Sequence, residues 1–357
     1  MINIINFLRR SQHVRHAAFV LGAFHFLIQV FYWFPACAAG VHVKRDWQIY
    51  YAAGQLVRHG QSPFAAHPDF TAAKTPHLYL YSPQFASIME PLSRLSPAVF
   101  LKLWYHLVEA AFWLFCIVLA RLSSPKRIWP EAVFGWSLAL AVTPGVYYST
   151  SLGQADVFVW LLFALGIACR QPAWFAACLQ IKPYFFWPTL IGAVRGGRRT
   201  AAAIAVTLIV GFGMGLAVCG AGAFRDWIAA ASLVGSEGTF NRDNLSLSFA
   251  VLRLARLFGW RYTSGPLPEW AHIYLRTAAV AGPAAAVYLT RKMDARKAAV
   301  IGSLAAMLFS PICWTAYLVI GYALVAMWLR ETIERAEAEN EPRPQHGIAT
   351  GPADPSR

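Results

Sequence analysis

Long apolar runs separated by short polar segments occupy most of the chain. A helix needs about 20 apolar residues to cross the hydrocarbon core of a bilayer. The pattern therefore predicts an all-α, polytopic membrane protein. The predicted spans cover about residues 16–41, 98–122, 129–147, 157–168, 172–194, 201–221 and 271–290, followed by two short spans on either side of Ser310-Pro311.

The segment 172–194 conflicts with a single crossing. One ordinary span here would leave the basic cluster at 195–199 outside, although Lys and Arg favour the cytoplasmic side. Pro183 and Pro188 interrupt the helix, so two short helices that meet at Lys182-Pro183 would return the chain to the inside. Irregular backbone at membrane depth is tolerated where it is buried in protein or lines a cavity. We therefore expect a cavity near Lys182.

Counting the broken pair as two gives a bundle of about ten membrane helices, with both termini cytoplasmic and two large outer loops. The first loop runs to about Pro97 and the second covers about 222–270. Within the second loop, residues 249–257 predict a short amphipathic helix suited to the membrane interface. Residues 1–330 form the predicted membrane domain, and 331–357, rich in Glu, Ala and Pro, form a partly disordered cytoplasmic tail.

The composition indicates a membrane protein and argues against nucleic acid as its partner. Hydrophobic residues make up 57% of the chain and charged residues 13%, with a mean hydropathy of +0.44. In a soluble protein the net charge of +14 would suggest nucleic acid, but here the basic residues form clusters between spans and orient the helices. The first run exceeds the roughly 7–15 apolar residues of a cleaved signal peptide, so we interpret it as a retained anchor.

Several kinds of chemistry are not expected. The six cysteines are scattered and show no CxxC spacing, and no His cluster has the form of a zinc site; we predict neither a metal site nor a disulfide framework. No nucleotide-binding signature is present. An enzyme of this kind would need no cofactor and would use a group delivered on a lipid.

Asp46 is the leading candidate for catalysis. It follows the first span directly and is backed by Trp47, Tyr50 and Tyr51 at helical spacing. One interpretation is a solvated acid beside an interfacial aromatic belt; the other is a general base for a substrate whose tail lies in the bilayer. In the second span, a polar set at helical spacing either faces a cavity or forms an intramembrane pair: Lys102, His106 and Glu109.

Short motifs in a fixed order carry a resemblance to a known family. In the first outer loop they are Asp46 with Tyr50-Tyr51, Gly60-Gln61-Ser62-Pro63-Phe64, Tyr79-Leu80-Tyr81-Ser82-Pro83-Gln84 and Glu90-Pro91-Leu92. Further on they are Gly153-Gln154, Ile181-Lys182-Pro183, Asn244-Leu245-Ser246-Leu247 and Ser310-Pro311-Ile312-Cys313-Trp314. Together they resemble glycosyltransferase family 87, polyprenol-phosphate-mannose-dependent mannosyltransferases and their relatives with the GT-C fold.

The resemblance implies sugar transfer on the outer membrane face, with inversion, from a polyprenyl-phosphate donor to a lipid or glycan acceptor. Asp46 matches the acid that takes the acceptor proton. Because negative charge develops on the leaving phosphate, we nominate Lys182 and Arg242 as its ligands. The candidates for substrate binding are Tyr50, Tyr51, Tyr81, Gln154, Asn244 and Trp314.

Each supporting residue also has a structural interpretation. Lys182 can snorkel to the interface, and Arg242 can form a surface pair with Asp243. Gln154 and Asn244 can cap a helix or close a turn, and the aromatic candidates can be belt residues. We interpret Asp156 as an N-cap rather than a second catalytic acid.

Two rival functions remain at this stage. Broken helices and intramembrane charges also mark transporters and lipid flippases, although the two outer loops share no motif that would indicate a repeat. The second rival function is that of a non-catalytic scaffold subunit. Thr315 suggests it, because it follows Trp314 at a position where the family commonly has a His. We expect a bacterial cytoplasmic (inner) membrane protein whose active site lies on the periplasmic or extracellular side.

Overall fold

The computed structural model describes residues 12–40, 46–65, 79–124, 130–237, 244–258, 267–311 and 313–340. All regular elements in these ranges are helices, and the β-structure there is an isolated bridge between Asn244 and Trp314. The first half contains α2 (Gln12–Ile28), the π-helix η1 (Gln29–Trp33), α3 (Phe34–Ala38), α4 (Asp46–Arg58), α5 (Pro83–Leu92), α6 (Pro97–Ser123), α7 (Pro130–Ala141), α8 (Pro144–Leu152) and α9 (Asp156–Ala168). The second half contains α10 (Ala173–Leu179), the 3-10 helix η3 (Pro183–Phe185), α11 (Phe186–Arg195), α12 (Gly197–Glu237), α13 (Leu247–Leu257), α14 (Glu269–Leu289), α15 (Ala295–Phe309), the 3-10 helix η4 (Thr315–Gly321) and α16 (Tyr322–Asn340).

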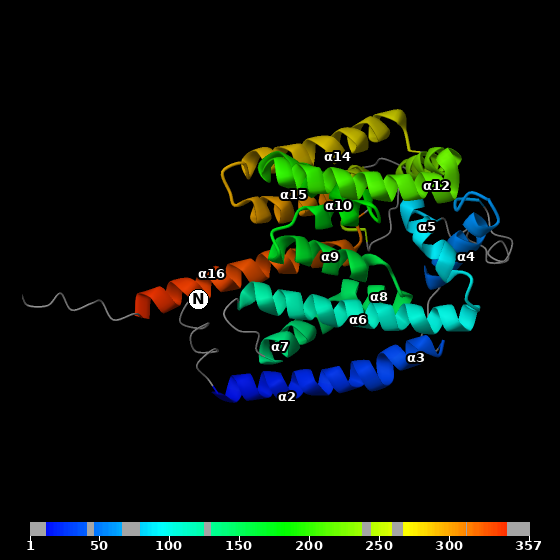
Figure 1. Ribbon diagram of the computed structural model, residues 1–357. Helices are drawn as coiled ribbons and strands as arrows, with labels where there is room; N and C mark the ends of the chain where they lie inside the picture. The colour runs from blue at the N-terminus through cyan, green and yellow to red at the C-terminus, as the bar shows by residue number, and fades with distance from the viewer. Residues whose placement is uncertain are drawn as a thin grey trace, which may run out of the picture.

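The long helices run roughly along one axis of the molecule (Figure 1). The start of α2 and the end of α16 lie at one end, which we call the basic end because the cluster 195–199 also lies there. Helices α4 and α5 lie at the other end, the α4 end. Helix α9 occupies the middle and packs against α6 and α10, with Trp160 and Phe163 fully buried.

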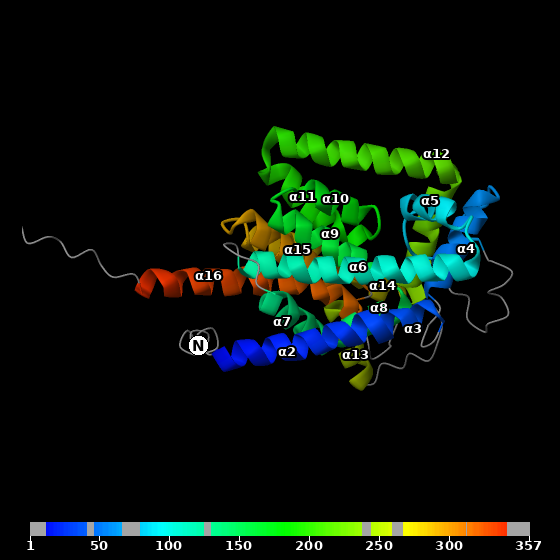
Figure 2. The ribbon, with the colours of Figure 1, turned by 60° about the horizontal axis from the view of Figure 1, so that its bottom comes forward.

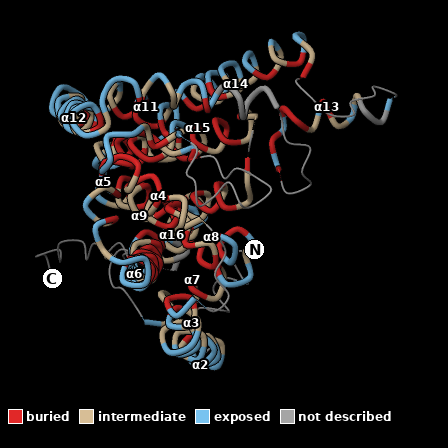
Figure 3. The backbone as a smooth tube through the Cα atoms, turned by 90° about the vertical axis from the view of Figure 1, so that its right-hand side faces the viewer, coloured by how far each residue is buried: buried red, intermediate tan, exposed pale blue. Residues whose placement is uncertain are grey.

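Four described helical stretches are long and apolar enough to cross a membrane: His16–Ala38, Pro97–Ser123, Gly197–Ala231 and Thr315–Arg335. Helix α9 is apolar but shorter. The structure is thus that of an all-helical membrane protein, while the predicted number of about ten membrane helices is not confirmed. Exposed residues concentrate on α2 and α12 and buried ones in the middle (Figure 3). Apolar side chains such as Phe31 and Ile209 point outward there, as contact with lipid requires.

Prolines and a glycine set the helix boundaries. Pro144 begins α8, and its neighbour Thr143 is extended, as a residue before proline prefers; the predicted span 129–147 is therefore two helices, α7 and α8. In α12 the break lies at Gly220, with φ 76°, a conformation that a side chain disfavours. Figure 2 shows α12 bending there toward the α4 end. The predicted span 201–221 is thus only the first part of α12.

The pair of short helices predicted for residues 172–194 is confirmed, whereas the space that Lys182 lines is only about 10 Å³. Helices α10 and α11 are short, pack against each other and are joined through Lys182 and η3. Pro183 starts η3, and Lys182 before it is extended. The chain therefore turns back within the bundle, and α12, which follows α11, begins at the basic end (Figure 1).

Three further predictions concern α6, α16 and α13. In α6, Lys102 and His106 are exposed, and His106 lies 3.4 Å from Glu109; the set forms an outward pair rather than a face toward a cavity. Helix α16 continues to Asn340, so the predicted tail is helical for its first ten residues, 331–340. A helix also forms where the interfacial helix was expected, as α13.

Candidate active site

The site is organised by the turn between α8 and α9. Helix α8 ends at Gly153, whose φ of 65° is left-handed. The Trp104 indole donates to the Gly153 carbonyl at 2.6 Å, and the Tyr105 hydroxyl donates to the Ser151 carbonyl at 2.8 Å. A Cβ at position 153 would lie 3.2 Å from both aromatic side chains. Glycine thus lets the turn pack tightly on α6, which fixes the three residues that follow.

The first of these residues, Gln154, holds Asp46. The Gln154 amide nitrogen donates to Oδ2 of Asp46 at 2.8 Å, and Oε1 of Gln154 accepts from the Ser149 hydroxyl at 3.0 Å. Asp46 is the first residue of α4 and is half-buried. A carboxylate at a helix N-terminus is stabilised by the helix dipole. Asp46 is therefore an oriented carboxylate rather than a freely solvated acid.

The second residue of the turn, Ala155, holds Tyr50. The Ala155 amide donates to the Tyr50 hydroxyl at 3.1 Å, and that hydroxyl donates to the Tyr81 hydroxyl at 2.8 Å. Burial, followed by the charge of Asp46, raises the pKa of Tyr50 well above its ordinary value, so the phenol keeps its proton. Tyr50 is 1% exposed, and its hydroxyl joins α4 to the turn between α8 and α9.

The third residue of the turn, Asp156, pairs with Lys182. The Lys182 Nζ lies 3.4 Å from Oδ1 of Asp156 and 3.3 Å from the Tyr317 hydroxyl, to which it donates. It also lies 4.3 Å from the centre of the Tyr81 ring and 4.7 Å from that of Tyr317. The Lys182 side chain is 11% exposed, so it does not snorkel to the surface. Asp156 is not the predicted N-cap: Ala155 has that position, and Asp156 is the buried partner of a cation.

Three predicted residues lie in supporting contacts. The Tyr51 hydroxyl donates to the Leu95 carbonyl at 2.9 Å. The buried Asn244 amide donates to the Pro311 carbonyl at 3.0 Å and accepts from the Cys313 amide at 2.8 Å. Trp314, half-buried, forms the bridge with Asn244. Asn244 therefore ties the segment before α13 to the segment after α15.

Arg242, the second predicted phosphate ligand, lies outside the described residues. Nor do the described parts of the chain bring together three or more His, Cys, Asp or Glu side chains that could hold a metal ion.

A groove of about 360 Å³ lies between α12 and α14, near the α4 end (Figure 1). It is lined by Pro183, Trp227, Ile228, Ala231, His272, Leu275, Arg276 and Pro311. Pro183 follows Lys182 directly, so the groove adjoins the buried pair. His272 and Arg276 lie one turn apart on α14, and neither side chain has a hydrogen bond or ion pair with another described residue. The groove combines an apolar wall with two basic side chains.

The sequence predicted five residues of one connected group and missed two others. Asp46, Gln154, Tyr50, Tyr81 and Lys182 lie in one network of contacts. The group's other members, Asp156 and Tyr317, were not predicted in these roles. Basic residues one turn apart on an apolar helix are a usable signal in a membrane protein, and that signal could have found His272 and Arg276.

Comparison with known proteins places the chain in a family. The model of glycosyltransferase family 87 matches residues 79–315, about two thirds of the chain, and these include Gln154, Asp156, Lys182 and Arg276. Asp46 and Tyr50 precede the matched range. Searches of curated proteins and of solved structures found no match. The match confirms the resemblance seen in the motifs: the chain belongs to glycosyltransferase family 87 and is a membrane glycosyltransferase.

Proposed function

We propose that the protein transfers a sugar, mannose or a related one, from a polyprenyl-phosphate carrier to a hydroxyl of a lipid or glycan acceptor on the outer face of the cytoplasmic membrane. Asp46 acts as the general base. The observation that carries this proposal is the half-buried Asp46 carboxylate held at 2.8 Å by Gln154. It lies in α4, at the same end of the molecule as the part of α14 that lines the groove.

The transfer is a single displacement at the anomeric carbon. The acceptor oxygen attacks this carbon from the face opposite the phosphate, and its proton passes to the Asp46 carboxylate. The bond between the anomeric carbon and the phosphate oxygen breaks, and polyprenyl phosphate leaves with the electron pair. One displacement inverts the configuration. A positioned base contributes about 10²–10⁴-fold to such a reaction.

The groove suits a lipid-linked donor. Trp227, Ile228 and Leu275 offer an apolar wall to the isoprenoid chain, while His272 and Arg276 offer positive charge to the phosphate. Fixed cations at the position where charge develops stabilise the transition state, and Arg binds phosphate through paired hydrogen bonds.

Lys182 has a supporting role in this scheme. Its charge is already matched by Asp156, and two rings enclose it. A phosphate would have to displace a buried carboxylate to reach it. We therefore assign the phosphate to the groove and let the Lys182–Asp156 pair fix the turn that carries Gln154. Such second-layer contacts hold catalytic groups in place.

The test is a transfer assay with the purified full-length protein. A synthetic polyprenyl-phosphate mannose is incubated with membrane lipid acceptors, and products are detected by mass spectrometry. We expect a covalent product with inverted configuration, and a loss of about 10²–10⁴-fold in Asp46→Asn. Glu269→Gln is the matched control, because this exposed carboxylate lies in the first turn of α14 and outside the groove lining.

Two outcomes would contradict the proposal. Unchanged activity in a correctly folded Asp46→Asn protein would show that Asp46 is not the general base. Movement of the carrier across vesicles without any covalent product would make the protein a transporter of lipid-linked sugars.

A further inference from the structure

A second cavity, of about 240 Å³, lies at the basic end, opposite Asp46 (Figure 1). It is bounded by the turn after α9, the junction of α11 with α12, and the start of α15. Arg170, Arg195 and Arg296 line it together with Asp294. Three guanidinium groups around one cavity are an unusual concentration of charge in a membrane protein and point to an anion.

Arg195 supplies the clearest evidence. Its Nη1 is buried, and no described residue accepts a hydrogen bond from it. A buried charged donor without an acceptor is costly, and such a group in a folded protein calls for an explanation such as a bound ion. Arg195 ends α11, where the helix dipole favours a cation. The dipole does not provide the missing acceptor.

Arg170 has an unusual backbone. Its φ of 55° is left-handed, and the Gln171 amide donates to the Gly166 carbonyl at 3.1 Å. These are the features of a helix C-terminus at which glycine is the usual residue. An arginine in this left-handed conformation strains the backbone, and its side chain lines the cavity. The side chain is therefore a candidate for a specific role.

The charge of the cavity is only partly matched within the chain. The Arg296 Nε lies 3.1 Å from Asp294. Burial raises the pKa of Asp294, but the Arg296 guanidinium and backbone N–H groups bring it below its ordinary value, so the carboxylate is ionised. One of three positive charges is thus matched. Neither Arg170 nor Arg195 forms an ion pair with a described residue.

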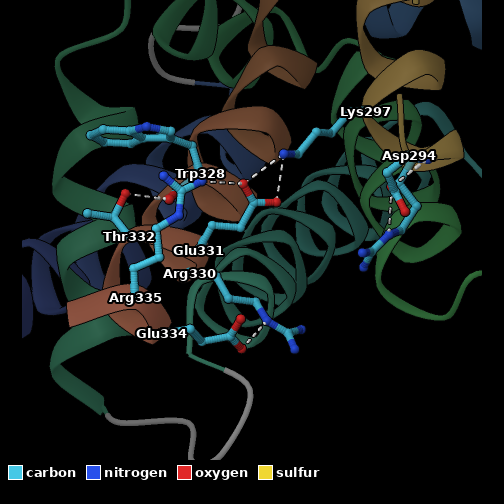
Figure 4. Close-up of polar contacts among 9 residues, drawn as sticks. Asp294, Lys297, Trp328, Arg330, Glu331, Thr332, Glu334 and Arg335 are labelled. Atoms are coloured by element: carbon cyan, nitrogen blue, oxygen red, sulfur yellow. Dashed lines mark hydrogen bonds and ion pairs between the residues drawn. The ribbon is translucent and has the colours of Figure 1, made fainter. Parts of the chain in front are cut away.

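Two other basic residues at this end are different, because they have carboxylate partners. Figure 4 shows Lys297 reaching Glu331, at 2.7 Å, and Arg330 reaching Glu334, at 2.8 Å. Arg170 and Arg195 therefore differ from these two paired residues.

We propose that this cavity binds the phosphate group of an anionic membrane lipid, with Arg170 and Arg195 as its ligands. The residues that precede Arg195 and Asp294 in the sequence are apolar and exposed, Val194 by 76% and Met293 by 42%. Exposed apolar residues next to the lining residues favour a lipid over a soluble anion. Basic pockets between membrane helices are known to accept acidic lipid headgroups. A bound headgroup would link α9, α11 and α15 and would complete the hydrogen bonds of Arg195.

The experiment measures thermal unfolding of the full-length protein in neutral detergent. Phosphatidylglycerol, phosphatidylcholine and inorganic phosphate are titrated separately, on the wild type, Arg195→Gln, Arg170→Gly and Arg198→Gln. Arg198 is the matched control, because it is exposed at the same end and does not line the cavity.

We expect phosphatidylglycerol to raise the unfolding temperature of the wild type and of Arg198→Gln. In Arg195→Gln its apparent affinity should fall by about tenfold or more, as loss of a hydrogen bond to a charged group implies. Arg170→Gly should unfold without lipid at a temperature no lower than the wild type, since glycine fits the left-handed position, and should still lose lipid affinity. This variant separates binding from folding.

Three results would overturn the proposal. If phosphatidylglycerol and phosphatidylcholine raised the unfolding temperature equally, the cavity would not require a net negative charge on the lipid. An equal effect of inorganic phosphate would show a site for a free anion instead. A loss of affinity in Arg198→Gln as large as that in Arg195→Gln would indicate diffuse attraction to a basic surface.

Discussion

Replacing Gln154 with leucine removes the amide that orients Asp46 while keeping a side chain of similar length. The Gln154 nitrogen donates to Oδ2 of Asp46 at 2.8 Å, and no charge is lost in the substitution. The carboxylate would then be free to rotate, and the half-buried Asp46 would lose one donor. We expect slower transfer without a loss of donor binding.

The size of the effect follows from the kind of hydrogen bond. A bond to a charged group contributes about 1.5–3 kcal/mol, and about 1.4 kcal/mol corresponds to tenfold in rate. If that energy is used to hold the base, kcat should fall by about 10–150-fold in Gln154→Leu. Ser149→Ala removes only the neutral bond at 3.0 Å to Oε1 of Gln154, so it should cost about tenfold at most.

The assay is steady-state transfer from a synthetic polyprenyl-phosphate sugar, with kcat and KM measured separately. A KM for the donor close to that of the wild type would show that Gln154 positions the base. A raised KM would indicate that Gln154→Leu disrupts the donor site. The reasoning would be refuted if folded Gln154→Leu retained kcat within twofold of the wild type, or if Ser149→Ala were the more damaging of the two.

The remaining predictions concern the buried pair and the groove. Lys182→Met leaves Asp156 buried without its cation and should lower the free energy of unfolding by about 3–5 kcal/mol. Unfolding in detergent measures this change. A stability equal to that of the wild type would show that the Lys182–Asp156 pair does not hold the turn in place. The double variant Lys182→Met/Asp156→Leu should recover most of the loss, since an apolar pair can replace a buried ion pair. Arg276→Gln should raise the KM for the donor by about 10–100-fold, whereas an unchanged KM would place the donor phosphate outside the groove.

The sequence predicted the broken helix pair because two independent constraints agreed there. Pro183 excludes a continuous helix, and the basic residue Arg195 fixes which end the chain must return to. The structure has the same arrangement, α10 and α11 joined through η3. Helix boundaries were predictable where a proline or glycine dictates them, but the bend at Gly220 was missed because glycine in an apolar run is ambiguous.

The contacts within the site were not predictable in the same way. Asp46 and Gln154 both belong to motifs, yet they are 108 positions apart, and only the packing of the turn on α6 brings them together. The partner of Lys182 could not be inferred from spacing, because Asp156 reads locally as the start of a helix. Tyr50 has the pattern of an interfacial aromatic, yet it is buried against Phe85 and Trp104, and its hydroxyl accepts from the Ala155 amide. Periodicity predicts which segments are helical, whereas these contacts depend on tertiary packing.

The single-turnover rate of Asp46→Asn, measured with the enzyme in excess over the donor, tests the central claim most directly. Asparagine keeps the shape of the side chain and removes the basic oxygen. We predict a rate about 10²–10⁴-fold below that of the wild type, with donor affinity retained. A rate within a few-fold of the wild type in a folded protein would contradict the account and would assign the acceptor proton to another group.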